Sequence, residues 1–391
     1  MKKKIFLFAV AALALAACSN DETVTVNQSD AISFRPLMSN VTRAADATLG
    51  TTGSFKATAF KTGETTSPYF DEVVFTGTGG TYTSAQKYYW PAEDGKLDFY
   101  AWSPSNLDAG ANDYNNFTIT PSTTVADQID FVYAVTKGWG KTTRSGGNGV
   151  AINFRHAESK IKFNVQNTNP NLKITVGTVT IKNLRGSETF SWNGVTDGIT
   201  PTAAADANTD GQYTTGTLTY LNGTWTDSSA QTTAYTTPAM YATGDYNVLN
   251  GTVAAKDIVG SGTASDYDMI LIPQALKIAT TYASVAENAA FEGACILVQL
   301  KIQNKKDGSY IIGSSGAFVT AMWPLTALTW LPGHQYTYTI DLAGGGFNPT
   351  NTADNDDDLD PILEGSEIKF VTVTVDNWET NGIGGVYVTG L

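Results

Sequence analysis

Apolar and polar residues alternate along most of the chain, in short runs separated by turn residues. In residues 55–60, 97–102 and 161–165, every second side chain is apolar. A period of two is the period of a β-strand that buries one face. Comparable runs occur at residues 73–75, 130–134, 150–154, 174–184, 217–220, 269–273, 294–302, 336–342 and 368–375. No window combines a helical period with helix caps, so the pattern predicts an all-β fold of packed antiparallel sheets.

Glycine-rich stretches interrupt this pattern at two places. Residues 76–80 join two strand runs and predict a β-hairpin with a loop longer than two residues. Residues 138–149 carry five glycines and no apolar period, which indicates a domain boundary or a long loop near one. We therefore place an N-terminal domain at residues 44–147 and a C-terminal domain at residues 148–391, each long enough for its own core.

The N-terminus has the pattern of an export signal. Three lysines at positions 2–4 precede an apolar run that ends with Leu15, Ala16 and Ala17. This order predicts a signal peptide over residues 1–17, and the apolar run is too short to span a bilayer. Cys18 follows at once, as in the lipobox of bacterial lipoproteins, where the thiol takes a diacylglyceryl group. Two acyl chains would anchor the protein stably in a membrane. The alternative interpretation is an ordinary signal peptide that happens to be followed by a cysteine.

Residues 18–43 have the features of a propeptide that contains a first strand. The residues that carry the strand pattern are Thr23, Val24, Val26, Ile32 and Phe34. A small residue, Ala44, follows Arg43 in a mostly polar setting, and this order suits a trypsin-like protease. From these residues alone, a solvated loop arginine is the favoured interpretation of Arg43, and the rest of the chain changes that balance.

Charge and cysteine content narrow the function classes. Residues 1–43 hold five Lys/Arg and three Asp/Glu, which leaves 19 basic and 34 acidic residues from Ala44 on, a formal charge of −15. No basic patch is available for phosphate contacts, so we expect no nucleic-acid partner. The chain has two cysteines, Cys18 and Cys295. Once Cys18 is lipidated, Cys295 has no intramolecular partner and is interpreted as a small core residue.

No arrangement of residues predicts catalysis, a metal or a cofactor. The two histidines, His156 and His334, lie far apart, and His156 is better interpreted as a structural residue at a strand end than as a base. No Cys/His spacing fits zinc. The acidic residues 354–360 lack the glycine and glutamate of a calcium loop, so a solvated loop is favoured over a weak calcium site.

Two further motifs are weighed and set aside. Gly140, Lys141 and Thr142 do not form a phosphate loop, because Val135 stands where its first glycine is required. The eight tryptophans could stack on sugars, but several lie in strand patterns where core packing is the commoner role. We therefore predict that the protein is not an enzyme.

Several stretches together resemble the fimbrillin family of Bacteroidota, the subunits of type V pili. They are residues 32–34 with 42–44, 89–91, 97–101, 154–161, 271–274, 332–338 and 373–378. The acidic pair at positions 21–22 also resembles the surface-export signal of Bacteroidota lipoproteins. The family resemblance implies two transthyretin-like antiparallel β-sandwich domains in tandem.

The resemblance also implies an assembly route. The precursor would reach the cell outer membrane as a lipoprotein, and a trypsin-like protease would cut it after Arg43. The first strand would then leave, and a donor strand from another fimbrial subunit would replace it in a cell-surface fimbrium. The donor candidate in this chain is the tail at residues 383–391, with Val386, Tyr387, Val388 and Leu391. A receptor on a host or bacterial surface is a further expected partner.

Other functions stay open at this stage. The tail beyond residue 378 is short and rich in glycine, so a shaft subunit and a tip or accessory subunit are both compatible with it. A surface lipoprotein that captures glycans and keeps its lipid is one rival. A secreted hydrolase is a weaker rival, because the densest carboxylate cluster lies in the expected loop at 354–360.

Overall fold

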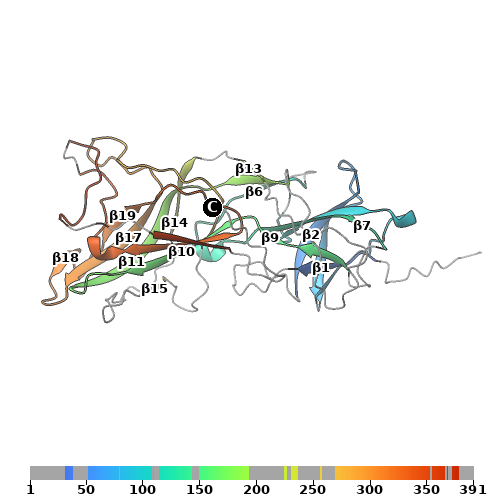
Figure 1. Cartoon of the computed structure of the whole chain (residues 1–391), viewed down its shortest axis with the longest axis horizontal. Helices are drawn as coiled ribbons and strands as arrows, with labels where there is room; N and C mark the ends of the chain where they lie inside the picture. The colour runs from blue at the N-terminus through green and yellow to red at the C-terminus, as the bar shows by residue number, and fades with distance from the viewer. Residues whose placement is uncertain are drawn as a thin grey trace, which may run out of the picture.

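The computed structural model describes residues 31–37, 52–78, 80–107, 109, 114–142, 149–192, 224–226, 230–236, 256–257, 269–352, 355–365, 368 and 372–377. Within these ranges the protein is built from β-strands, with three single turns of 3₁₀-helix at Ala92–Asp94, Val125–Asp127 and Leu342–Gly344. The all-β sandwich predicted from the alternating pattern is confirmed. Two groups of sheets follow one another along the long axis of the molecule (Figure 1).

The first group is dominated by one eight-stranded sheet with the order β8-β1-β4-β3-β2-β5-β7-β9. Its strands are β1 (Phe34–Leu37), β2 (Thr52–Lys61), β3 (Phe70–Thr78), β4 (Thr81–Ser84), β5 (Leu97–Ser103), β7 (Val132–Trp139), β8 (Val150–Asn153) and β9 (Arg155–His156). Neighbouring strands are antiparallel except β1 and β8, which are parallel. The predicted hairpin is present as β3 and β4, with Gly77 opposite Tyr82. Only residues 79–80 lie between the two strands, so the expectation of a loop longer than two residues is wrong, because the strand pairing continues through Gly77 and Thr78.

Both faces of this sheet are covered, which the burial of β5 makes plain. Leu97, Phe99 and Ala101 point into one apolar core, and Trp102 belongs to a second one. That second core is closed by a three-stranded sheet, β6 (Asn116–Ile119), β12 (Glu188–Ser191) and β13 (Thr224–Thr226). Because β6 pairs with β12 across about 70 residues of sequence, this small sheet ties the first part of the chain to the second.

The second group is a sandwich of two five-stranded sheets. One holds β10 (Ser159–Gln166), β15 (Lys256–Asp257), β16 (Met269–Leu271), β20 (His334–Asp341) and β21 (Thr372–Asn377). The other holds β11 (Leu172–Arg185), β14 (Gln231–Thr236), β17 (Cys295–Asn304), β18 (Tyr310–Ile312) and β19 (Val319–Pro324). All pairs are antiparallel except β10 and β20, which are parallel.

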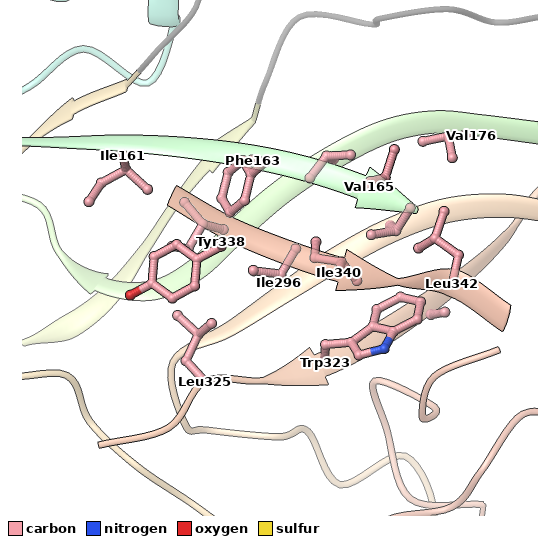
Figure 2. Packing of buried hydrophobic residues seen from close by; sticks show 14 of the residues in the cluster. Ile161, Phe163, Val165, Val176, Ile296, Trp323, Leu325, Tyr338, Ile340 and Leu342 are labelled. Carbon is pink, nitrogen blue, oxygen red and sulfur yellow. The ribbon is translucent and has the colours of Figure 1, made fainter. Parts of the chain in front are cut away.

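The core of this sandwich follows from the period of two. Ile161, Phe163 and Val165 alternate along β10 and share one buried face, as their spacing predicts. Figure 2 shows them over Tyr338 and Ile340 of β20, with Ile296 of β17 and Trp323 of β19 in the same cluster. A side chain buried in this way contributes about 1.5–3 kcal/mol relative to an exposed one.

The change from the first group to the second does not coincide with the glycine-rich stretch. Gly138 and Trp139 are the last residues of β7, and β8 and β9 follow residues 143–148 but still pair inside the first sheet. The chain leaves that sheet between β9 and β10, at residues 157–158. The division at residue 147 and the number of domains stay predictions from the sequence.

Candidate functional site

Strand β1 lies inside the first sheet, between β4 and β8. Phe34 is opposite Tyr82 of β4, and residues 34–37 pair with Val150–Asn153 of β8. Just before β1, the Ile32 N–H donates to the Tyr88 carbonyl at 2.7 Å, and the Val150 N–H donates to the Ser33 carbonyl at 2.7 Å. We call the space between β4 and β8 that residues 31–37 fill the β1 slot.

The side chain of Phe34 is enclosed by other aromatic rings. Its ring centroid is 5.5 Å from Phe55, 4.7 Å from Phe75 and 5.1 Å from Phe99, and all three contacts are edge-to-face. Phe34 is 0% exposed and Ile32 is 1% exposed. Edge-to-face aromatic pairs add about 0.5–1.5 kcal/mol each beyond the area they bury. Phe34 is therefore the main side-chain anchor of β1.

Two glycines shape the walls of the β1 slot. At Gly149, where φ is +87°, an added Cβ would lie 2.8 Å from the Ser33 carbonyl oxygen, so only glycine lets the two backbones approach this closely. At Gly77, an added Cβ would meet the ring of Tyr82 at 2.3 Å. The missing side chain at Gly77 lets Tyr82 lie flat over β3, where its ring centroid is 5.3 Å from Phe55.

The backbone of β1 is held less firmly than its side chains. It meets β4 at one residue pair and β8 at four, and one of these four involves Pro36, which has no N–H to donate. If residues 31–37 were removed, β4 and β8 would present unpaired edges, and the Phe34 and Ile32 positions would become apolar hollows. Such an edge is a template for another extended chain.

Most of the site residues predicted from the sequence lie outside the described residues. These are Cys18, Thr23, Val24, Val26, Arg43, Ala44, Val386, Tyr387, Val388 and Leu391. Ile32 and Phe34 are described, and they lie together in the β1 slot. Sequence reasoning did not find Gly77, Tyr82 or Gly149. The sequence marks these positions only by glycines at the ends of strand runs. Such glycines also occur at ordinary turns.

A group of buried polar side chains lies at the end of the first sheet, on β9 and the turn that follows it. His156 Nδ1 is 2.9 Å from Asp130 Oδ1, and both side chains are almost fully buried. Glu158, which is 0% exposed, accepts a hydrogen bond from the Phe131 N–H at 2.9 Å through Oε2, whereas its Oε1 has no hydrogen-bond partner among the described residues. Burial raises the pKa of Glu158 well above its usual range, and the nearby Asp130 raises it further.

This polar group holds the two sheet groups in register at their junction. The Gly333 N–H of the second group donates to the Glu158 carbonyl at 2.8 Å, and Ser159 Oγ donates to the Leu331 carbonyl at 2.9 Å. The arrangement suits a structural role for His156, since its ring lies inside the fold and faces a carboxylate. Sequence reasoning singled out His156 but not Glu158, because a glutamate before a strand usually faces solvent.

The free thiol of Cys295 lies in the second group. It is 1% exposed at the start of β17, and burial raises its pKa to about 12. The interpretation of Cys295 as a small core residue agrees with this position, because a thiol that is neither accessible nor ionised does not react.

A hollow of about 490 Å³ lies beside β20 and β21. Its walls include Leu276, Leu328, Leu331, His334, Tyr336 and Val375. His334 Nδ1 is 2.8 Å from the Pro332 carbonyl, a contact within its own turn. The hollow is mostly apolar and brings together no set of groups suited to acid–base chemistry.

The acidic loop is held by its own hydrogen bonds. Asn351, which is buried, donates through Nδ2 to the carbonyls of Ser284 and Asp356, and Asp360 Oδ2 accepts from both the N–H and the hydroxyl of Thr352. Over the described ranges, no group of three His, Cys, Asp or Glu side chains is placed to hold a metal ion.

The tryptophans that were considered for stacking on sugars are largely buried. Trp102, Trp139, Trp323 and Trp330 are at most 1% exposed. Trp102 Nε1 donates to the Leu107 carbonyl at 2.9 Å, and Trp330 Nε1 donates to the Tyr338 hydroxyl at 2.8 Å. Trp225 is half-buried, and its Nε1 donates to the Ala157 carbonyl at 3.1 Å. These rings pack the cores and are not available as a stacking platform.

The fold and the β1 slot define a class of protein: an all-β sandwich whose first sheet is completed by a strand from the very start of the chain. The model of the fimbrillin-like family matches residues 42–378, and the chain belongs to this family. No curated protein sequence matches the chain.

Solved structures similar to this fold come from Bacteroides and Parabacteroides species. A fimbrial protein from Bacteroides vulgatus has a TM-score of 0.50 at 12% identity, with 89% of this chain and 99% of that chain covered. A candidate cell adhesion protein from Bacteroides ovatus has a TM-score of 0.46 at 14% identity over 90% and 98%. One from Bacteroides uniformis has a TM-score of 0.43 at 15% identity over 89% and 97%.

Family membership makes this a fimbrial protein of the cell surface, in a family of structural proteins and not of enzymes. Other fimbrial subunits are the partners that the family suggests. In the described part of the chain, no helix is long and apolar enough to cross a membrane.

Proposed function

We propose that the protein is a pilus subunit that is exported as an outer-membrane lipoprotein, cut after Arg43 and polymerised by donor-strand exchange. The observation that carries the proposal is the place of β1. This strand precedes the proposed cut, yet it lies between β4 and β8 and anchors the first core through Phe34. A cut after Arg43 separates β1 from every other strand of its sheet.

The lipid anchor supplies the first stage of this route. Acylation at Cys18 would hold the precursor at the outer membrane, since two acyl chains give stable binding without a spanning helix. After the cut, the lipid and β1 belong to the same fragment, residues 18–43. Loss of that fragment therefore frees the subunit from the membrane and opens the β1 slot in one step.

A donor strand then restores what the sheet has lost. An extended segment from another subunit can satisfy the open edges of β4 and β8 by main-chain hydrogen bonds, while alternate side chains enter the hollows. The tail candidate in this chain has Val386 and Val388 on one face at strand period, preceded by two glycines that let it swing out. A shaft subunit would both give and receive a strand, whereas a tip subunit would only receive one.

Controlled proteolysis tests the proposal. Purified precursor is treated with a low dose of trypsin, the protease is inhibited, and size is followed by light scattering. The cut wild-type protein should form either polymers with itself, which we call ladders, or complexes in which it accepts the donor strand of a sister subunit, which we call capped complexes. The Arg43→Ala protein should form neither. A wild-type protein that loses residues 18–43 and then neither assembles nor caps a sister subunit would contradict donor-strand exchange.

Two variants separate the parts of the route. Cys18→Ala should abolish labelling of the protein by a fatty-acid analogue in cells, and undiminished label would disprove acylation at this residue. A chain truncated after Glu379 should still accept a strand but no longer give its own. If the truncated chain forms ladders with itself, the tail is not the donor.

A further inference from the structure

We propose that the β1 slot selects a donor with an aliphatic residue and an aromatic residue two positions apart, and that this donor comes from a different subunit and not from this chain's own tail. The inference rests on the function proposed above and specifies its partner. It follows from the shape of the two hollows that Ile32 and Phe34 fill.

The hollow at Phe34 has the size and geometry of an aromatic ring. Phe55, Phe75 and Phe99 surround it on three sides, and all three present their edges or faces to the Phe34 ring at 4.7–5.5 Å. Phe55 also contacts Phe154 at 5.1 Å, so this wall is supported from behind. Because interiors are close-packed, a smaller side chain would leave a void that these rings cannot collapse to fill.

The hollow at Ile32 lies two residues before this position. Ile32 is 1% exposed and belongs to the same core as Phe34, and the intervening Ser33 has its carbonyl paired with β8. The close approach of Gly149 to Ser33 fixes the depth of the strand in the slot. A donor that occupies the slot at this depth must therefore present two apolar side chains at a spacing of two, one of them aromatic.

The tail of this chain does not meet the requirement in any register or direction. Its single aromatic residue, Tyr387, has Gly385 and Thr389 two positions away. With Tyr387 in the aromatic hollow, the Ile32 hollow would hold glycine or threonine, and the Tyr387 hydroxyl would enter a box of phenylalanines without a polar partner.

The other face of the tail is too small for the slot. Val386 and Val388 are two positions apart, but a valine in the aromatic hollow lacks most of the volume of the Phe34 ring. The segment that leaves, with Ile32 and Phe34, is thus a better match than the tail that would replace it. The tail strand cannot compete with the propeptide strand for the β1 slot. A matched strand from another subunit can displace the propeptide strand.

Peptide binding to the cut protein tests this selection directly. The probes are a labelled peptide of residues 31–37, the same peptide with Phe34→Val, and a peptide of the tail residues 384–391. We expect the wild-type peptide to bind at least about tenfold more tightly than either of the others, because the Phe34→Val peptide loses the buried aromatic ring and the tail peptide cannot fill both hollows at once. Equal affinity of all three peptides would overturn the inference.

A change in the full chain gives a second test that does not disturb the sheet. Val388→Phe places an aromatic residue two positions after Val386 and should let the cut chain assemble with itself, which the cut wild-type chain should not do. Tyr387→Phe is the matched control, because its aromatic residue still has only Gly385 and Thr389 at that spacing, and it should behave like the wild type. Equal ladders from wild type and Val388→Phe would contradict the inference.

The outcomes separate this inference from the proposed function. If residues 18–43 leave after the cut and the three peptides bind equally, donor-strand exchange stands and the selection is wrong. If mass spectrometry of the cut protein shows that residues 18–43 stay bound even with excess wild-type peptide, the proposed function fails and the selection fails with it.

Discussion

Strand β1 of the first group and the long strands of the second group bury similar side chains but pair with their neighbours over different lengths. In the second group, β11 pairs with β17 at nine residue positions, and β10 pairs with β20 at seven. In the first group, β1 pairs with β4 at one position and with β8 at four. Both kinds of strand are apolar on their inner face, and both are buried.

This contrast supports the proposed route, in which β1 completes the core of the precursor and is later removed. The strands β10, β11, β17 and β20 pair over long stretches. No single cut of the backbone would detach one of them alone from the rest of its sheet. Strand β1 depends mainly on Ile32 and Phe34, and its backbone contributes a short ladder with a proline in it. On the proposed route, side-chain burial would keep β1 in place while it is tethered, and the short ladder would lower the barrier to its exchange.

We expect the largest effect from a substitution that destabilises both the precursor and the cut protein. Trp323→Ala removes a fully buried ring from the core of the second group and should cost about 3–5 kcal/mol of unfolding free energy. Urea unfolding of the precursor and of the cut protein measures it. Because Trp323 lies far from β1 in the fold, the loss should be the same in both forms, and a loss confined to the precursor would contradict the comparison.

A change at β1 should weaken only one form. Phe34→Ala should cost about 3–5 kcal/mol in the precursor, since the ring leaves a cavity among Phe55, Phe75 and Phe99. The cut protein that has lost residues 18–43 should show no difference from wild type. Ser33→Ala, on the opposite face of the same segment, is the matched control and should stay within about 0.5 kcal/mol. A penalty that persists after the segment leaves would show that β1 is not removed.

The junction between the groups should respond to pH through Glu158. Its pKa is raised by burial, so the native state binds a proton that the unfolded state has released above its pKa of about 4.3. The stabilisation from this group is therefore complete below about pH 4.3. It falls by up to about 1.4 kcal/mol per pH unit as the pH rises towards the folded-state pKa.

The variant Glu158→Gln isolates this contribution. Glutamine keeps an acceptor for the Phe131 N–H and has no charge to bury. The difference in unfolding free energy between variant and wild type should grow in favour of the variant from pH 4.5 upward, because only the wild type has a carboxyl group at position 158 that must lose its proton inside the fold. A difference that does not change with pH would contradict the assignment to Glu158.

The smallest expected effect is kinetic and concerns Cys295. The folded piece of residues 44–391, which lacks Cys18, should react with a thiol reagent only after denaturation, because the Cys295 sulfur is 1% exposed and its pKa is raised to about 12. Absorbance of the released chromophore follows the reaction. Rapid labelling of the native protein, at the rate of the urea-treated sample, would mean that β17 is not a core strand.

Much of the fold could be predicted because burial on one face leaves a period of two in the sequence. The runs at β2, β5, β10 and β17 are long and regular, and all four form strands close to the predicted places. Strands that were not predicted, such as β6, β12 and β18, have three or four residues each. A run that short carries too few alternations to differ from a loop.

The candidate site could be predicted only in part. Ile32 and Phe34 stood out by their alternation, but their partners come from β2, β3 and β5, which are separated from them in sequence and joined only by the sheet order. The glycine-rich residues 138–149 indicated a boundary, yet the chain returns to the same sheet after them, and pairing between β1 and β8 is the reason. A parallel pairing of this kind leaves no local signal in the sequence.

The most direct measurement is the N-terminal sequence of the protein taken from fibres sheared off the cell surface. If β1 leaves after a cut at Arg43, the mature subunit begins at Ala44, and Ile32 and Phe34 are missing from the fibres. A fibre protein that still begins with a lipidated Cys18 would contradict the account, because the β1 slot would then remain filled by the chain's own strand.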